Sequence, residues 1–296
     1  MVELPPPVVG SLSPSRASDF VACPLRYRFR VLDRLPEAPS REATRGTLVH
    51  SVLERLFDLP AVRRTEQQAA ALLPGEWERL RRESPEVGAL FSDEQAEQEW
   101  LRSAEDLLAG YFTLEDPRRL SPVGREEHVE VVLSSGLRLH GIVDRLDRSP
   151  AGDLRVVDYK TGRAPSEVFE ARALFQMKFY ALVLWRTRGV VPKSLQLLYL
   201  GDRQVLRYEP DEADLLATER KLAALWAAIS RATETGDFRP HPSALCGWCD
   251  HQRICPEFGG TPPPFPGAPQ PAGGQPAPTL ASSAATLSDV RDPITS

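Results

Sequence analysis

Two short apolar segments joined by turn residues constrain the fold of this chain most strongly. Residues 137–146 and 154–159 are rich in Leu, Ile and Val, and the turn-forming sequence SPAGD separates them at residues 149–153. Strand-like runs separated by such residues are typical of a β-hairpin. Asp144 lies near the end of the first predicted strand and Asp158 near the end of the second. Buried strands have little reason to carry carboxylates there unless these meet a metal, a substrate or each other.

The residue types at these strand ends suit metal chemistry. Side chains alternate between the two faces of a strand, so Asp158 and Lys160 point the same way, with Asp144 one strand away. Carboxylate oxygens suit Mg²⁺ or Mn²⁺, and a nearby Lys can polarise an attacking water. The pattern fits metal-assisted phosphodiester hydrolysis. The alternative is a surface salt bridge from Asp144 to Arg145 or Arg155, and these residues alone leave both interpretations open.

The composition is that of an ordinary globular protein, with 42% hydrophobic and 26% charged residues. A length of 296 residues allows one large domain or two small ones. The first residues have neither a basic segment nor a long apolar run, and no later window reaches transmembrane length. We therefore expect a cytoplasmic protein with no membrane partner.

The charge of the chain is unevenly distributed. The formal net charge is −5, yet residues 60–118 alone contain 13 acidic and 7 basic residues, a net of −6. The densest basic run lies near the amino terminus, and its arginines could follow a phosphate backbone or form a solvated basic face. From this run we expect Arg26, Arg28 and Arg45 to contact DNA.

Further helices and strands are predicted on both sides of the hairpin. A helix that starts at Ser13 or Ser15 leads to Cys23, and a second, residues 44–59, carries His50 at the edge of an apolar stripe. Such a His is often a partly buried core residue rather than a ligand. The other expected elements are a helical region at 61–115, a strand at 127–133, a helix at 169–185, strands at 194–200 and 204–208, and a helix at 211–233. This order predicts an α/β fold around a mixed sheet.

Composition also predicts the boundaries of the domain. We expect a flexible segment at residues 1–12, one domain at 13–258, and a disordered tail rich in Pro, Gly and Ala at 259–296. Within the domain, residues 60–118 form an acidic helical insertion and residues 241–258 a cysteine segment.

The four cysteines predict a single metal site. Cys246, Cys249 and Cys255 have the spacing C-x2-C-x5-C, and Cys23 stands alone near the amino end. Disulfides are uncommon in long cytoplasmic chains, whereas four thiolates complete a zinc site or a [4Fe–4S] cluster. The arrangement of three clustered ligands plus one distant ligand favours iron–sulfur, although the spacing leaves structural Zn²⁺ open.

Together these features resemble the RecB-like branch of the PD-(D/E)XK nucleases. Within it they resemble the iron–sulfur members, such as the AddB nuclease domain and the CRISPR adaptation exonucleases. The resemblance covers residues 13–258 and includes the four cysteines. The four motifs that carry it are Gly46-Thr47-Leu48-Val49-His50, Gly141-Ile142-Val143-Asp144, Asp158-Tyr159-Lys160 and Gln176-Met177-Lys178-Phe179-Tyr180.

The resemblance implies a restriction-endonuclease-like core and a role for each motif. His50, Asp144 and Asp158 would bind Mg²⁺ or Mn²⁺ together with the carbonyl of Tyr159, and Lys160 would activate water or stabilise phosphate. The same four side chains, His50, Asp144, Asp158 and Lys160, are the implied catalytic residues. Gln176 and Tyr180 would line the DNA groove, and the cysteines would hold a [4Fe–4S] cluster.

The implied function is metal-dependent DNA exonuclease activity in repair or recombination. We expect the substrate to be single-stranded DNA or DNA with free ends. The G-x-x-x-x-G-K-[ST] loop of motor proteins does not occur in the sequence, so a helicase partner would be a separate chain. Two alternatives are a non-catalytic DNA-binding or assembly subunit and a zinc-stabilised binding protein. Retention of four charged or metal-ligating side chains argues against the first, because a scaffold does not need a costly buried charge cluster.

Overall fold

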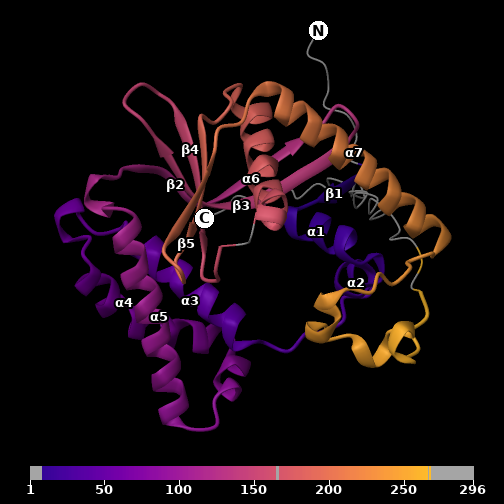
Figure 1. Ribbon diagram of the computed structural model, residues 1–296, viewed down its shortest axis with the longest axis horizontal. Coiled ribbons are helices and arrows are strands. Elements are labelled where there is room, and N and C mark those ends of the chain that lie inside the picture. The colour runs from indigo at the N-terminus through magenta and orange to yellow at the C-terminus, as the bar shows by residue number, and fades with distance from the viewer. Residues whose placement is uncertain (1–8, 165–166, 266, 268–296) are drawn as a thin grey trace, which may run out of the picture.

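A computed structural model of the protein describes residues 9–164, 167–265 and 267 (Figure 1). Its centre is a six-stranded sheet with the order β1-β3-β4-β5-β6, in which β2 also pairs with β3. β1 runs parallel to β3 and β4 parallel to β5, and the other neighbours are antiparallel. The strands are β1 (Gly10–Leu12), β2 (Pro122–Val132), β3 (Leu137–Arg148), β4 (Leu154–Lys160), β5 (Ser194–Tyr199) and β6 (Gln204–Tyr208). This mixed sheet confirms the predicted fold class.

β3 has strand partners on both edges. β2 pairs along one edge, from Arg138 to Asp147. The other edge is divided, because β1 pairs with residues 137–139 and β4 with residues 145–148. Residues 140–144 of β3 therefore lie between two partner strands on that edge. We call this interval the β3 gap.

Helices cover both faces of the sheet, each over its own hydrophobic core (Figure 1). Because side chains alternate along a strand, β4 directs Val156 into one core and Val157 and Tyr159 into the other. Residues of α1, α6 and α7 build the first core, and residues of α3, α4 and α5 build the second. The α-helices are α1 (Pro14–Ala22), α2 (Pro24–Tyr27), α3 (Arg41–Leu56), α4 (Glu66–Glu83), α5 (Glu94–Leu114), α6 (Glu167–Arg188) and α7 (Glu212–Thr235).

Serine caps fix where the two helices near the amino end begin. Ser13 Oγ accepts a hydrogen bond from the Arg16 N–H at 3.3 Å, as expected. α3 starts three residues earlier than expected, because Ser40 Oγ caps the Ala43 N–H at 3.1 Å. The short helical elements are η1, a π-helix (Arg28–Leu32), and the 3₁₀ helices η2 (Ala61–Arg63), η3 (Pro85–Leu90), η4 (Pro117–Arg119), η5 (Ala244–Trp248), η6 (Gln252–Ile254) and η7 (Pro256–Phe258).

The structure departs from the expected domain boundaries at both ends. Gly10–Leu12 form β1 instead of belonging to a flexible segment, since they find a partner in β3 that a three-residue pattern cannot reveal. Phe265 was expected in the disordered tail, but its ring packs 5.4 Å from that of Phe238. The remainder of the tail, residues 268–296, lies outside the described residues.

The acidic insertion consists mainly of α4 and α5, which pack with α3 beneath the sheet (Figure 1). α5 approaches the end of β5 so closely that a Cβ on Gly110 would lie 2.5 Å from the Leu200 carbonyl oxygen. The insertion is thus docked on the sheet by direct contact with its backbone. Within the described residues, none of the helices combines the length and hydropathy needed to cross a bilayer.

Gly110→Ala should destabilise the protein by about 1–3 kcal/mol, because the added methyl overlaps backbone that cannot move aside easily. Gly75→Ala on α4 is the matched control, since a Cβ there would meet nothing within 4 Å. Replacing glycine by alanine inside a helix stabilises by roughly 0.5–1 kcal/mol. Thermal unfolding should therefore show a lower Tm for Gly110→Ala and an equal or higher Tm for Gly75→Ala. Equal Tm values for the two variants would contradict the tight docking of α5.

Candidate active site

The predicted catalytic residues meet where β3 and β4 separate. Pairing between these strands ends at Arg145 and Val157, and β4 then continues beside β5 alone. The Tyr159 peptide consequently lacks a strand partner on its β3 side. Asp144 Oδ2 accepts the Tyr159 N–H at 2.7 Å, and the Tyr159 carbonyl lies 2.9 Å from His50 Nε2. Two side chains of the site thus replace the missing ladder bonds.

Asp158 and Lys160 share one face of β4, as expected, and a glutamine of α6 joins them. Lys160 Nζ lies 2.6 Å from Asp158 Oδ2 and donates to Gln176 Oε1 at 3.0 Å. The Gln176 amide nitrogen lies 2.8 Å from Asp158 Oδ1 and 3.2 Å from Tyr180 Oη. An amide that accepts from the ammonium and donates to the carboxylate holds both groups in place. The structure therefore places Gln176 and Tyr180 beside the catalytic pair.

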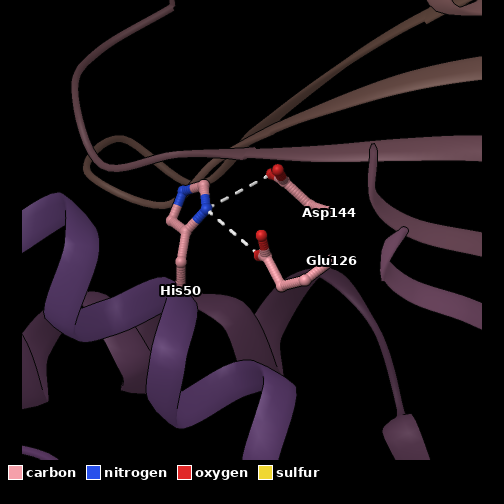
Figure 2. A group of neighbouring side chains, drawn as sticks. All are labelled: His50, Glu126 and Asp144. Carbon is pink, nitrogen blue, oxygen red and sulfur yellow. Dashed lines mark ion pairs between the residues drawn. The ribbon is translucent and has the colours of Figure 1, made fainter. Parts of the chain in front are cut away.

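Three further ligand atoms converge on the other side of the separation point (Figure 2). His50 Nδ1 lies 3.4 Å from Asp144 Oδ2 and 4.0 Å from Glu126 Oε1, and one ligand atom from each residue lies within 4.8 Å of the others. With the imidazole proton on Nε2, which donates to the Tyr159 carbonyl, the Nδ1 lone pair faces both carboxylates. We call His50, Glu126 and Asp144 the acidic triad.

The sequence did not reveal Glu126. This residue lies one position before the predicted start of its strand, and its backbone φ of 42° is unusual for a non-glycine residue. β2 begins at Pro122 instead of residue 127, because pairing with the long β3 extends it through polar residues. A charged pair at residues 126–127 ahead of an apolar run was the only signal, and it has no fixed spacing from the other motifs.

Burial makes the acidic triad unfavourable as bare charges. The pKa of Asp144 is raised well above its ordinary value by burial and by the nearby Asp158 carboxylate. The pKa of Glu126 is raised to about 6, first by burial and then by Glu54 and Asp158. Burial also lowers the pKa of His50, so the imidazole tends to be neutral. A divalent cation would relieve the repulsion between the carboxylates.

The donor set fits a hard divalent metal ion. One imidazole and two carboxylates face a common point, and Asp158 Oδ2 is buried with no hydrogen bond among the described residues. The Lys160 ammonium is 2.6 Å away from that oxygen but outside hydrogen-bonding angles. Oxygen-rich sites of this kind with a single nitrogen ligand suit Mg²⁺ or Mn²⁺.

Two hollows open beside these residues. A cleft of about 390 Å³ lies between α3, α4 and β2, and its lining includes His50, Glu126 and, from the insertion, Arg79. A groove of about 400 Å³ lies along the β3 gap, and Gln176 and Tyr180 line it. We call these hollows the α3–α4 cleft and the β3-gap groove. Because α3 and α4 cover one face of the sheet and α6 the other, the hollows approach the catalytic residues from opposite faces.

The glycine of the predicted G-x-x-D motif has a steric reason. A Cβ on Gly141 would lie 2.7 Å from the Tyr180 ring. Any larger residue would push Tyr180 out of the groove and disturb its contact with Gln176, which is 3.2 Å away. Gly141 therefore allows α6 to bring its two polar side chains up to β3.

The three arginines expected to contact DNA occupy different environments. Arg26 is partly exposed and pairs with Asp19 at 2.9 Å, and Arg45 is partly exposed and donates to Ser103 at 3.0 Å. Arg28 is buried, with an ion pair to Asp33 at 3.1 Å. The buried guanidinium stabilises the turn after α2 and has little access to a phosphate in solvent.

The structure brings all four cysteines to one pocket. Cys23 lies between α1 and α2, and it lines this pocket together with Cys246, Cys249 and Cys255. Burial raises the pKa of the Cys255 thiol, and the other three cysteines add to the rise. Backbone N–H groups of residues 241 and 243 donate to the sulfurs of Cys23 and Cys246 at 3.4 and 3.3 Å. The distant amino-terminal cysteine and the carboxyl-terminal segment therefore form one cluster.

A sequence profile of the PD-(D/E)XK nuclease superfamily matches residues 11–256 of the chain. The chain belongs to the PD-(D/E)XK nuclease superfamily. Two phage relatives are the Gene 69 protein of Mycobacterium phage D29, 26% identical over 83% of this chain and 96% of that protein, and its namesake in phage L5, 31% identical over 42% of this chain and 41% of that protein.

Two other relatives of this superfamily member match less of the sequence or less closely. One of the subunits of the ATP-dependent helicase/deoxyribonuclease of Streptococcus agalactiae is 26% identical over 39% of this chain, which corresponds to 10% of that much longer protein. A crystal structure described as "Putative exonuclease" from Eubacterium rectale superposes with a TM-score of 0.53, covering 82% of this chain and 88% of that chain at 15% identity. At that identity the structural likeness confirms the PD-(D/E)XK fold alone.

Glu126→Gln should stabilise the metal-free protein at neutral pH but not near pH 4.5. The folded state raises the pKa of Glu126 from 4.5 to about 6, so its ionisation between these values disfavours folding. The difference in Tm between variant and wild type, measured in chelator, should therefore grow as the pH rises from 4.5 to 7. Glu130→Gln changes an exposed carboxylate on the same strand and is the control. A Tm difference that does not vary with pH would contradict the burial of Glu126.

Proposed function

We propose that this protein is a metal-dependent DNA exonuclease of the RecB-like branch, acting on single strands or free ends in repair or recombination. The observation that carries the proposal is the acidic triad placed next to the Asp158–Lys160 pair. Membership of the PD-(D/E)XK nuclease superfamily supports phosphodiester hydrolysis. The name of the streptococcal relative, part of a helicase/deoxyribonuclease, supports DNA as the substrate.

The residues of the site would divide the work of hydrolysis. His50, Glu126 and Asp144 would hold the ion, with Asp158 beside them. When bound, Mg²⁺ or Mn²⁺ supplies Lewis acidity toward the phosphate and lowers the pKa of water. The Lys160 ammonium, fixed by Gln176 at 3.0 Å, would orient the attacking water or stabilise the charge on the phosphate oxygens.

The backbone at β4 would support the same site. The Tyr159 N–H holds Asp144 in position at 2.7 Å. Its carbonyl, which we expected to be a metal ligand, lies 2.9 Å from His50 Nε2. That separation is close to the roughly 3 Å between neighbouring ligands of an octahedral ion with bonds of about 2.1 Å. The Tyr159 carbonyl therefore stays in the proposed set of ligands.

The two hollows would accommodate the nucleic acid on either side of the scissile bond. The β3-gap groove offers serine hydroxyls of α1 and the side chains of Gln176 and Tyr180 to a strand. Arg26 and Arg45, which are partly exposed, remain candidates for contacts with the phosphate backbone, whereas the buried Arg28 does not. A helicase partner in a separate chain, and a place in the cytoplasm, belong to the same proposal.

Asp144→Asn, Asp158→Asn and Lys160→Met should each lower the rate of cleavage by at least about a thousandfold, because each removes a group that acts in the transition state. The assay is degradation of end-labelled single- and double-stranded DNA in Mg²⁺ or Mn²⁺. Asp153→Asn is the control, since this carboxylate pairs with Lys193 at 3.1 Å in the turn after β3. Cleavage by Lys160→Met at the rate of wild type would refute the assignment, and inactive wild-type protein that binds DNA would favour a non-catalytic role in DNA binding or assembly.

We further propose that the cysteine pocket holds a structural [4Fe–4S] cluster, with Zn²⁺ as the alternative. The pocket unites the four sulfurs, and backbone N–H groups approach two of them. Hydrogen bonds to sulfur are among the features by which proteins tune iron–sulfur clusters. A cluster there would tie Cys23 to residues more than two hundred positions away and so stabilise the whole domain.

Protein purified without oxygen should be brown, with broad visible absorbance and four irons per chain, as expected of a [4Fe–4S] cluster. Cys23→Ala should lose the colour and aggregate as readily as Cys249→Ala, despite its isolation in the sequence. Trp248→Ala is the control, because this side chain is 88% exposed between two of the cysteines. Colourless, folded protein with one zinc per chain would establish the alternative, and an intact cluster in Cys23→Ala would show that the fourth ligand lies elsewhere.

A further inference from the structure

Arg145 is a fully buried cation whose contacts join β3, β4 and the helical insertion. Its side chain is 1% exposed. The guanidinium pairs with Glu115 at 2.7 Å, just after α5, and with Asp147 at 3.1 Å. It also donates to the hydroxyl of Tyr159 at 2.7 Å and, more weakly, to that of Tyr111 at 3.4 Å. A buried charge with this many partners fixes the relative positions of the elements that supply them.

Tyr159 carries this constraint into the proposed metal site. Its hydroxyl is held by Arg145, and its ring lies 5.8 Å from the His50 ring in an edge-to-face arrangement. The two backbone groups of the same residue contact Asp144 and His50, at 2.7 and 2.9 Å. One residue therefore connects a buried guanidinium to two members of the acidic triad.

Tyr111 provides a natural comparison, because it shares the environment without the connection. Its hydroxyl also contacts Arg145, and its ring packs against that of Tyr159 at 5.8 Å. Both tyrosines belong to the core beneath the sheet. Tyr111 lies in α5, however, and its backbone is part of that helix. Loss of either hydroxyl should affect packing, but only the Tyr159 hydroxyl is on the path to the metal ligands.

We propose that Arg145 and the Tyr159 hydroxyl are positioning groups for the metal ligands, and that the insertion contributes to the site through Glu115. This inference rests on the proposed metal-dependent function. Residues of the insertion thus have a role in holding Asp144 and His50, beyond covering one face of the sheet. Partners that orient metal ligands commonly change metal affinity by about 10- to 100-fold when removed.

The test compares Mn²⁺ binding by Tyr159→Phe, Tyr111→Phe and wild-type protein in the absence of DNA. The free Mn²⁺ signal in electron paramagnetic resonance gives Kd, and thermal unfolding gives Tm. Tyr159→Phe should raise Kd by about tenfold. Tyr111→Phe should leave Kd within about twofold of wild type at a similar loss of Tm. Glu115→Gln is a second variant from the insertion, and it should raise Kd less than Tyr159→Phe does.

The other outcomes overturn the proposal in distinguishable ways. An unchanged Kd in both Tyr159→Phe and Glu115→Gln would show that the buried network is structural only. Equal increases of Kd in Tyr159→Phe and Tyr111→Phe would assign the effect to general destabilisation of the core. Wild-type protein that binds no Mn²⁺ would overturn the proposed metal site itself, and this inference with it.

Discussion

The separation of β4 from β3 is the constraint on which the rest of the site depends. Paired strands satisfy their own backbone groups and leave no room for polar side chains between them. Where the two strands part, the Tyr159 peptide has an unpaired N–H and carbonyl, and the side chains of Asp144 and His50 replace the missing partners. The chemistry of the protein is thus located at an interruption of regular structure, and the β3-gap groove extends from the same interruption.

The two faces of the sheet contribute different parts of the site. On one face, α6 brings Gln176 to the Asp158–Lys160 pair. On the other, α3 brings His50 to Asp144 and Glu126. The carboxylates are buried enough that their pKa values rise, which makes the metal-free arrangement costly and favours a cation in their midst. Full stability without the ion would need neutral side chains at these positions, and those could not bind metal.

The fold class and the main catalytic residues were predictable, because each lies on a strong local pattern. Asp158 and Lys160 follow an apolar strand, and His50 and Gln176 lie on helices with clear periodicity. Glu126 was not predictable, since its position depends on how far β2 pairs along β3 and on an unusual backbone angle. Likewise, the burial of Arg28 depends on the ion pair with Asp33, which the density of basic residues in the sequence does not show.

The cysteine pocket has a consequence for synthesis of the chain. Cys23 leaves the ribosome early, whereas Cys255, which lines the same pocket, emerges only after the sheet and its helices have been made. Until then α1 can pack on the sheet, but the thiol of Cys23 waits without its companions. Completion of this pocket is therefore the last step by which the nascent domain can close, and a chain interrupted before residue 246 would retain a catalytic centre while leaving its two ends unfastened.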